Sequence, residues 1–239
     1  MNAKEEKMAD TYPKFDIRKY IKKYGELNYR KDVPETVCEK YKGKLPNDLI
    51  LFWQEYGIGT LLNGKFQFCI PSDYSGIVDI LFSGDQDIIP EKTYIVGFSA
   101  FGDLLIWNER FQRCEVSLPY LTMSIPKIDF NTFGTENFPL STVVAGIKYP
   151  EYFYIEPSDD QYPSLFEEAV DKIGEVTFGK CYGFFPALAL GGSPSVKHIQ
   201  IVDARVHFTL LAQMGNLRIL RENEQDNTEF VRNAGETTS

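Results

Sequence analysis

The chain has 239 residues, of which 43% are hydrophobic and 14% aromatic, so it can bury a sizeable core and is not an intrinsically disordered protein. Its net charge of −9 is uneven, because residues 1–50 carry +3 and residues 51–239 carry −12. An acidic body repels nucleic acid and anionic membranes, so neither is expected as a partner, whereas a basic protein would suit it. Plain solubility is the other reading of the same charge.

The cysteines and the start of the chain indicate the compartment. The four cysteines stand far apart in sequence, so they form no C-x-x-C metal motif. The opening stretch MNAKEEKMADTYPK lacks the apolar segment of a signal peptide. No apolar run approaches the roughly 18 residues that a membrane helix needs. We therefore expect a cytoplasmic protein with reduced thiols.

The first half of the chain predicts helices followed by a mostly antiparallel sheet. Residues 1–12 are polar and are expected to be disordered. Apolar spacing and stop signals predict helices at 15–24, 34–43, 45–57 and 71–82. Alternation predicts strands at 65–70, 93–100, 103–108 and 112–118. The fold class is therefore α+β, with Trp53 and Trp107 expected in its core.

The second half repeats this mixture on a smaller scale. Helices are predicted at 131–146 and 165–174, with a proline-rich linker between them and a strand-like run at 177–190. In the stretch 195–215, Ile199, Val202, Val206 and Leu210 follow helical spacing, although alternation of Ile199 and Ile201 leaves a strand open at its start. The tail from about Glu222 is polar and is expected to be disordered.

Nucleotide-binding motifs do not explain the double glycine of ALALGGSPS. The stretch has neither G-x-x-x-x-G-K-[ST] nor G-x-G-x-x-G, and no lysine follows the glycines before Lys197. Gly191 and Gly192 more simply supply positive φ in a turn. No cofactor is therefore expected.

Catalytic and metal sites are also poorly supported. GFSAFG nearly spells the G-x-S-x-G elbow, so a small serine hydrolase of unknown substrate, using Ser99 with His198 or His207, is the alternative reading. Its second glycine is one place late. Asp203 lies four residues before His207 and could share a helix face with it, but two ligands are too few for a closed metal site. We expect no metal and no enzyme activity.

Three stretches together resemble a known family. Leu45–Tyr74, with its F-W-x-x-Y-G-x-G ending and P-x-D-Y turn, and Ala100–Asn108, with A-F-G-D, resemble the GAD-like domain. CYGFFPALALGG followed by IVDARVHFTLLAQ resembles the C-terminal domain of type VI secretion immunity proteins. The resemblance spans roughly residues 45–215. It implies a GAD-like domain of helices and antiparallel sheet with a smaller α+β C-terminal domain packed against it.

The resemblance implies a domain order and a function. We expect a disordered N-terminus at 1–12, a GAD-like domain at 13–148, a linker at 149–163, an immunity-type domain at 164–220 and a disordered tail at 221–239. The implied function is an immunity protein that binds and neutralises a cognate toxin similar to metal-dependent DNases. A nucleic-acid accessory role is a third reading, which the −12 charge of residues 51–239 argues against.

The stretch CYGFFPALALGG is the first candidate for the partner surface. Aromatic residues supply large rigid contact area, so Tyr182, Phe184 and Phe185 suit an interface, although burial of all three is equally open. The glycine turn at Gly191 and Gly192 can shape that surface, and Asp203 and His207 either order the turn or meet the toxin. Because apolar residues gather at Cys181–Leu190, we expect apolar anchors there, with acidic residues assisting encounter rather than mimicking DNA.

Overall fold

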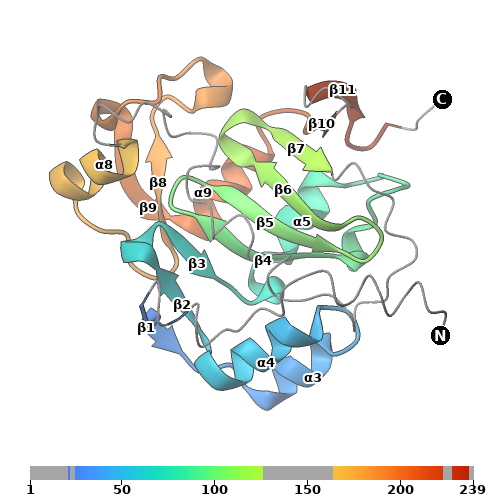
Figure 1. Ribbon diagram of the computed structural model, residues 1–239. Helices are drawn as coiled ribbons and strands as arrows, with labels where there is room; N and C mark the ends of the chain where they lie inside the picture. Colours follow the sequence, from blue (N-terminus) through green and yellow to red (C-terminus); the bar gives the residue numbers. More distant parts are fainter. Residues whose placement is uncertain (1–20, 22–24, 126–163, 223–227, 237–239) are drawn as a thin grey trace.

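The computed structural model describes residues 21, 25–125, 164–222 and 228–236, coloured along the chain in Figure 1. The disorder expected at 1–12, the helix predicted at 131–146 and the linker at 149–163 lie outside the described residues. Of the helix predicted at 15–24, only Ile21 is described.

A mixed sheet dominates the part of the chain that the structure describes. Neighbouring strands are antiparallel throughout, except that β7 and β10 run parallel. In spatial order the strands are β1 (Asn28–Lys31), β2 (Ile58–Leu61), β3 (Phe66–Phe68), β4 (Thr93–Ser99), β5 (Asp103–Asn108), β6 (Gln112–Ser117), β7 (Thr122–Ile125), β10 (Arg218–Glu222) and β11 (Thr228–Asn233).

Helices and a small second sheet complete the α+β fold, which confirms the predicted class. The α-helices are α3 (Glu35–Tyr41), α4 (Asn47–Tyr56), α5 (Ser75–Leu81), α8 (Leu165–Ile173) and α9 (Ala204–Ala212). Short 3₁₀ turns are η1 (Leu62–Gly64), η2 (Pro71–Asp73), η3 (Pro90–Lys92), η4 (Leu118–Tyr120), η7 (Leu188–Leu190) and η8 (Val196–His198). Strands β8 (Lys180–Phe184) and β9 (Ile199–Asp203) pair antiparallel. Among the described helices, none has the length and apolar character to cross a membrane.

The central strands are buried on both faces. Successive side chains of a strand point to opposite sides, so Leu104 and Ile106 of β5 join one apolar cluster while Leu105 and Trp107 join another. Helices α5 and α9 cover the first face, and α3 and α4 cover the second (Figure 1). This explains why the strand sequence DLLIWN is a nearly continuous apolar run.

Helix α4 forms where the sequence predicts it. Pro46 precedes its first turn as N-cap, and Gly57, at φ +73°, ends it with a bond from its N–H to the Trp53 carbonyl. Trp53 is buried, as Trp107 is, so both tryptophans are confirmed as core residues.

The C-terminal part docks on the turn between β4 and β5, which contains the A-F-G-D stretch. The Phe101 ring lies 5.4 Å from Tyr182 and 5.7 Å from Phe184, measured between ring centroids. The Tyr182 N–H donates to the Ala100 carbonyl at 2.7 Å. Gly102 has φ +96°, and a Cβ there would meet the Phe208 ring at 3.0 Å. This turn, which we call the docking turn, therefore connects the two parts of the molecule by direct contacts.

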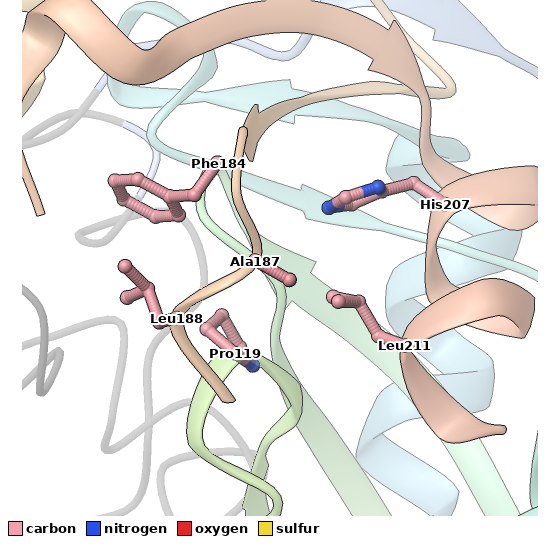
Figure 2. A pocket seen from close by; sticks show the side chains of 6 residues that line it. All are labelled: Pro119, Phe184, Ala187, Leu188, His207 and Leu211. Atoms are coloured by element: carbon pink, nitrogen blue, oxygen red, sulfur yellow. The ribbon is translucent and has the colours of Figure 1, made fainter. Parts of the chain in front are cut away.

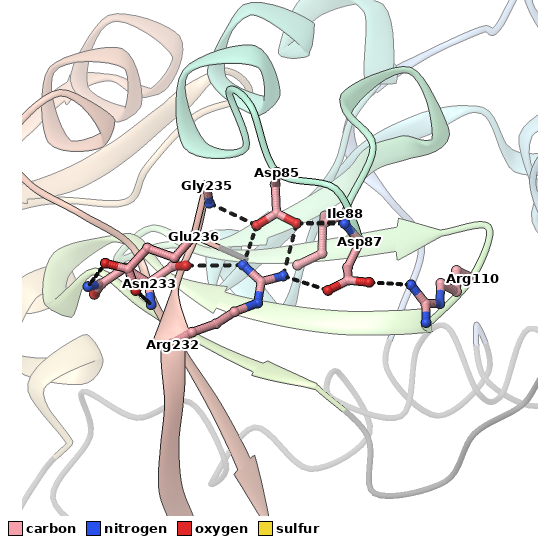
Figure 3. A network of polar contacts seen from close by, with 8 residues as sticks. All are labelled: Asp85, Asp87, Ile88, Arg110, Arg232, Asn233, Gly235 and Glu236. Carbon is pink, nitrogen blue, oxygen red and sulfur yellow. Dashed lines mark hydrogen bonds and ion pairs between the residues drawn. The ribbon is translucent and has the colours of Figure 1, made fainter. Parts of the chain in front are cut away.

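The prediction that residues 221–239 are disordered is wrong for Thr228–Asn233. This segment forms β11, which pairs with β10, and its Arg232 forms a buried ion pair with Asp85 (Figure 3). The Arg232 guanidinium donates to both carboxylate oxygens of Asp85, at 2.6 and 2.9 Å. By composition this segment is simply a polar tail. The strand is not apparent from the local sequence, because Asp85, the partner of Arg232, stands 147 positions earlier in the chain.

The pKa of Asp85 reflects this network. Burial alone would raise it, but Arg232 and the backbone N–H groups of Gly235, Ile88 and Asp87 donate to the carboxylate and hold the pKa below its usual value. Asp87 joins the network as well, since it pairs with Arg232 at 3.2 Å and with Arg110 at 2.6 Å (Figure 3). We call Asp85, Asp87 and Arg232 the β11 clamp.

Candidate functional site

The stretch IVDARVHFTLLAQ divides into a strand and a helix. Residues Ile199–Asp203 form β9, so the strand alternative is right for this part and the helical spacing that starts at Ile199 is not. Asp203 is the N-cap of α9, because its carboxylate accepts the Val206 N–H at 3.2 Å. The Asp203 carboxylate also pairs with Lys180 at 3.5 Å. Its role in the structure is therefore to start the helix.

Two of the three candidate aromatics are buried. Tyr182 and Phe184 are packed in an apolar cluster with Phe101 and α8, and the Tyr182 hydroxyl donates to the Gly174 carbonyl at 2.6 Å. Burial is the alternative left open for these aromatics, and it holds for Tyr182 and Phe184. Phe184 also lines the pocket described below. Alternation explains the burial of Tyr182 and Phe184, because both face the same side of β8 toward the docking turn.

Phe185 has the opposite environment. It follows the last residue of β8 and is 45% exposed. Its N–H donates to the His198 carbonyl at 2.8 Å, which fixes the backbone beneath the exposed ring. The ring centroid lies 6.0 Å from that of His207. Phe185 is therefore the candidate aromatic that a partner can reach.

The double glycine closes the loop that carries Phe185. Gly191 has φ +85°, and the Gly192 N–H donates to the Ala187 carbonyl at 3.0 Å. A Cβ at Gly192 would collide with the carbonyl oxygen of Pro186. The expected positive φ is therefore confirmed for Gly191 and wrong for Gly192, where glycine is required because the Pro186 carbonyl lies too close for a side chain. The neighbouring Leu190 is exposed.

A shallow apolar pocket lies between α9, the β8–η7 loop and η4 (Figure 2). It encloses no volume for a water-sized molecule, so it does not fit a small-molecule ligand. Its lining consists of Pro119, Phe184, Ala187, Leu188, His207 and Leu211.

His207 is the polar group of this pocket. Its side chain is 8% exposed and packs against Gly183, where a Cβ would lie 2.9 Å from the imidazole Cε1. Burial lowers the pKa of His207, so the ring is neutral at pH 7. The structure therefore brings His207 and Phe185 together and leaves Asp203 at the start of the helix.

Exposed apolar residues belong to two of the elements that line the pocket. They are Phe185 and Leu190 from the loop and Val206, Leu210 and Met214 along α9 and its C-terminal end. Val206 and Leu210 stand four positions apart and so share one stripe of α9, and Met214 follows just beyond the helix. We call these five residues the α9 face.

The exposure of Val206 and Leu210 is not evident from the sequence. Their spacing predicts a core stripe, yet the buried stripe of α9 is His207, Phe208, Leu211 and Ala212. The sequence does hold one signal of this exposure, since α9 has apolar residues on two faces. Only one face can pack against the core of the protein, so the other requires a different partner.

Ser99 is not placed as an exposed nucleophile. It is buried, and its hydroxyl donates to Asp103 Oδ2 at 2.9 Å while accepting the Asp103 N–H at 3.0 Å. Burial raises the pKa of Asp103 to about 6, and the hydroxyls of Ser117 and Ser99 offset part of that rise. No histidine bonds to Ser99 within the described part of the chain. The near-elbow GFSAFG is therefore a hydrogen-bonded hairpin turn.

Comparisons with known families agree with the order of these two parts. Residues 16–119 match the GAD-like domain, and residues 155–215 match the C-terminal domain of the T6SS immunity protein Tdi1. This domain order identifies a type VI secretion immunity protein. Both the docking turn and the α9 face lie within the matched segments of this immunity protein.

A solved structure supports the same fold. The crystal structure of Atu4351 from Agrobacterium tumefaciens is similar to this immunity protein with a TM-score of 0.82, at 24% sequence identity, over 94% of this chain and 100% of that chain. At this identity, the likeness shows a shared fold alone. A search of curated proteins gave no match.

Metal and thiol chemistry find little support in the described residues. No group of three or more His, Cys, Asp and Glu side chains there could hold a metal ion. The four cysteines are buried and free. Burial raises the pKa of the Cys114 and Cys181 thiols far above the usual value, so neither forms the reactive thiolate at pH 7.

Proposed function

We propose that this immunity protein binds and neutralises a cognate nuclease toxin in the cytosol, and that the α9 face is where the toxin docks. The observation that carries the proposal is that α9, which lines the shallow pocket through His207 and Leu211, also leaves the apolar side chains of Val206 and Leu210 exposed. Monomeric proteins seldom leave contiguous apolar side chains in water without a partner.

The geometry favours protein docking over small-molecule binding. The pocket is too shallow to enclose a ligand, but an apolar side chain from a partner can cover it and contact the exposed ring of Phe185, which lies 6.0 Å from His207 between ring centroids. Interfaces concentrate their binding free energy in a few such anchors, each costing about 2 kcal/mol or more on truncation.

In this proposal the protein neutralises the toxin by binding it and catalyses no reaction of its own. The hydrolase alternative needs an activated serine, whereas the Ser99 hydroxyl is buried and already bonded to Asp103. Neutralisation must hold against a lethal enzyme, so we expect nanomolar affinity or tighter, about −12 kcal/mol or beyond.

The experiment begins by recovering the gene beside the gene for this protein and testing whether its product is a nuclease. The purified nuclease is titrated with wild-type protein, Leu210→Asp and Leu51→Asp by calorimetry, and cells that express it are scored for survival. Leu51 on α4 is a matched control, since Leu210 and Leu51 are both 52% exposed.

We expect wild-type protein to bind the nuclease with nanomolar affinity and to rescue the cells. Leu210→Asp should lose both properties, whereas Leu51→Asp should keep them. Micromolar affinity, or cells that die despite wild-type protein, would refute the function. Equal behaviour of the two variants would refute the assignment of the face while leaving the function intact.

A further inference from the structure

The charge around the α9 face differs from that of the whole chain. The segment 176–221 has five Lys or Arg residues and one acidic residue, Asp203, a net charge of +4 in a protein of −9. The segment that supplies the α9 face is therefore basic, whereas the chain as a whole is acidic.

The basic residues that flank the α9 stripe have no ion-pair partner among the described residues. Arg205 is exposed in the first turn of α9, immediately before Val206. Arg218 is exposed four residues beyond Met214, and its N–H donates to the Leu121 carbonyl at 2.9 Å. Asp203, the acidic residue at the start of α9, is already engaged by Lys180 and by the helix N-terminus.

We propose that the partner segment seated on the α9 face is an apolar protein surface rimmed by carboxylates, which pair with Arg205 and Arg218. This proposal rests on the proposed function and specifies the chemistry of the toxin at the contact. Complementary charges at the rim of an apolar contact steer association and fix its orientation.

One consequence concerns the toxin. A nuclease lines its DNA-binding groove with Lys and Arg to neutralise phosphates. Arg205 and Arg218 would meet like charges there, which is unfavourable. The α9 face therefore docks on the nuclease outside that groove.

Nucleic acid fits this face less well than a protein does. Single strands need aromatic platforms for stacking, whereas Val206, Leu210 and Met214 are aliphatic and Phe185 is the one aromatic of the face. The net charge of −9 also opposes approach of a polyanion.

The test measures association and dissociation rates of the same nuclease with Arg205→Glu at low and high salt. Lys44→Glu, an exposed change in the loop before α4, is the matched control. A negative charge in the first turn of a helix is compatible with its dipole, so Arg205→Glu should still fold.

We expect Arg205→Glu to weaken binding roughly tenfold at low salt, mainly through the association rate, and less at high salt. Lys44→Glu should bind as wild type. Unchanged or tighter binding by Arg205→Glu, with Leu210→Asp still impaired, would overturn this proposal and leave the proposed function standing.

A second measurement detects the carboxylate directly. In the Arg205→Lys variant the new amine should couple to an Asp or Glu of the nuclease when a carbodiimide is added, and mass spectrometry identifies the joined peptides. A coupling at position 205 supports the proposal. Arg205-dependent binding of a DNA duplex by the free protein, or a Leu210-dependent dimer in sedimentation, would contradict it.

Discussion

The β11 clamp and the α9 face depart from ordinary burial in opposite directions. The clamp places the charged side chains of Asp85 and Arg232 inside the protein, where each satisfies the other. The α9 face leaves the apolar side chains of Val206 and Leu210 in water, although the opposite side of the same helix supplies core residues. Buried paired charges need nothing from outside, whereas exposed apolar groups gain free energy only when covered. The clamp therefore serves folding, and the face is the surface that we propose for binding.

The clamp should show the largest effect on stability. Arg232→Ala leaves Asp85 buried without its counter-ion, at a cost of about 3–5 kcal/mol in the free energy of unfolding. Chemical denaturation checks this. Arg110→Ala removes an exposed partner of Asp87 and should cost less than about 1 kcal/mol. Equal losses in the two variants would show that burial of the pair contributes nothing.

The adjacent phenylalanines separate folding from binding within one dipeptide. Phe184→Ala opens a cavity beneath the docking turn and should cost about 3–5 kcal/mol of stability. Phe185→Ala should change stability little and cost about 2 kcal/mol or more in toxin affinity. Denaturation and calorimetry on both variants test this. The distinction fails if Phe185→Ala unfolds the protein and Phe184→Ala does not.

Ser99 is a buried polar residue, and like the clamp it has no proposed role in binding. Ser99→Ala removes a hydrogen bond to buried Asp103 and should lower stability by about 1–3 kcal/mol. Toxin affinity and cell protection should stay as in wild type at temperatures where the variant is folded. Loss of protection with affinity and stability intact would favour the hydrolase reading.

His207 gives the smallest effect, a change in pH dependence. Its folded pKa lies below the ordinary 6.5, so the unfolded chain takes up the proton first and stability falls as pH drops below about 6.5. His207→Gln should remove this part of the decline. Asp103, with its pKa near 6, titrates in both proteins, so the difference between them isolates His207. If the stabilities of wild type and His207→Gln change in parallel from pH 7 to pH 5, titration of His207 does not contribute to the decline.

Much of the fold is predictable because local signals agree with it. Helix α4 has its proline, glycine and buried apolar stripe in order, and β4 and β5 have dense apolar runs around a glycine turn. The strand β11 is not predictable, because it depends on Asp85 from a distant loop. Likewise, four-residue β2 is fully buried but too short to show a pattern.

The candidate site is predictable in place but not in detail. The sequence directs attention to Cys181–Leu190 and to His207, and the pocket lies there. Which aromatic is exposed depends on where β8 ends, a boundary that composition does not fix. The exposed stripe of α9 could not be assigned, because Val206 and Phe208 are both apolar and only tertiary packing decides which one is buried.

The most direct test of the central claim compares Leu210→Asp with Leu51→Asp in binding the cognate nuclease. Both side chains are equally exposed on helices, at 52%, so the two changes should perturb folding alike. If the α9 face binds the nuclease, Leu210→Asp should weaken nuclease binding by at least tenfold, whereas Leu51→Asp should bind as wild type. Retained nanomolar binding by Leu210→Asp, with Leu51→Asp equal to it or weaker, would contradict the claim that this face binds the toxin.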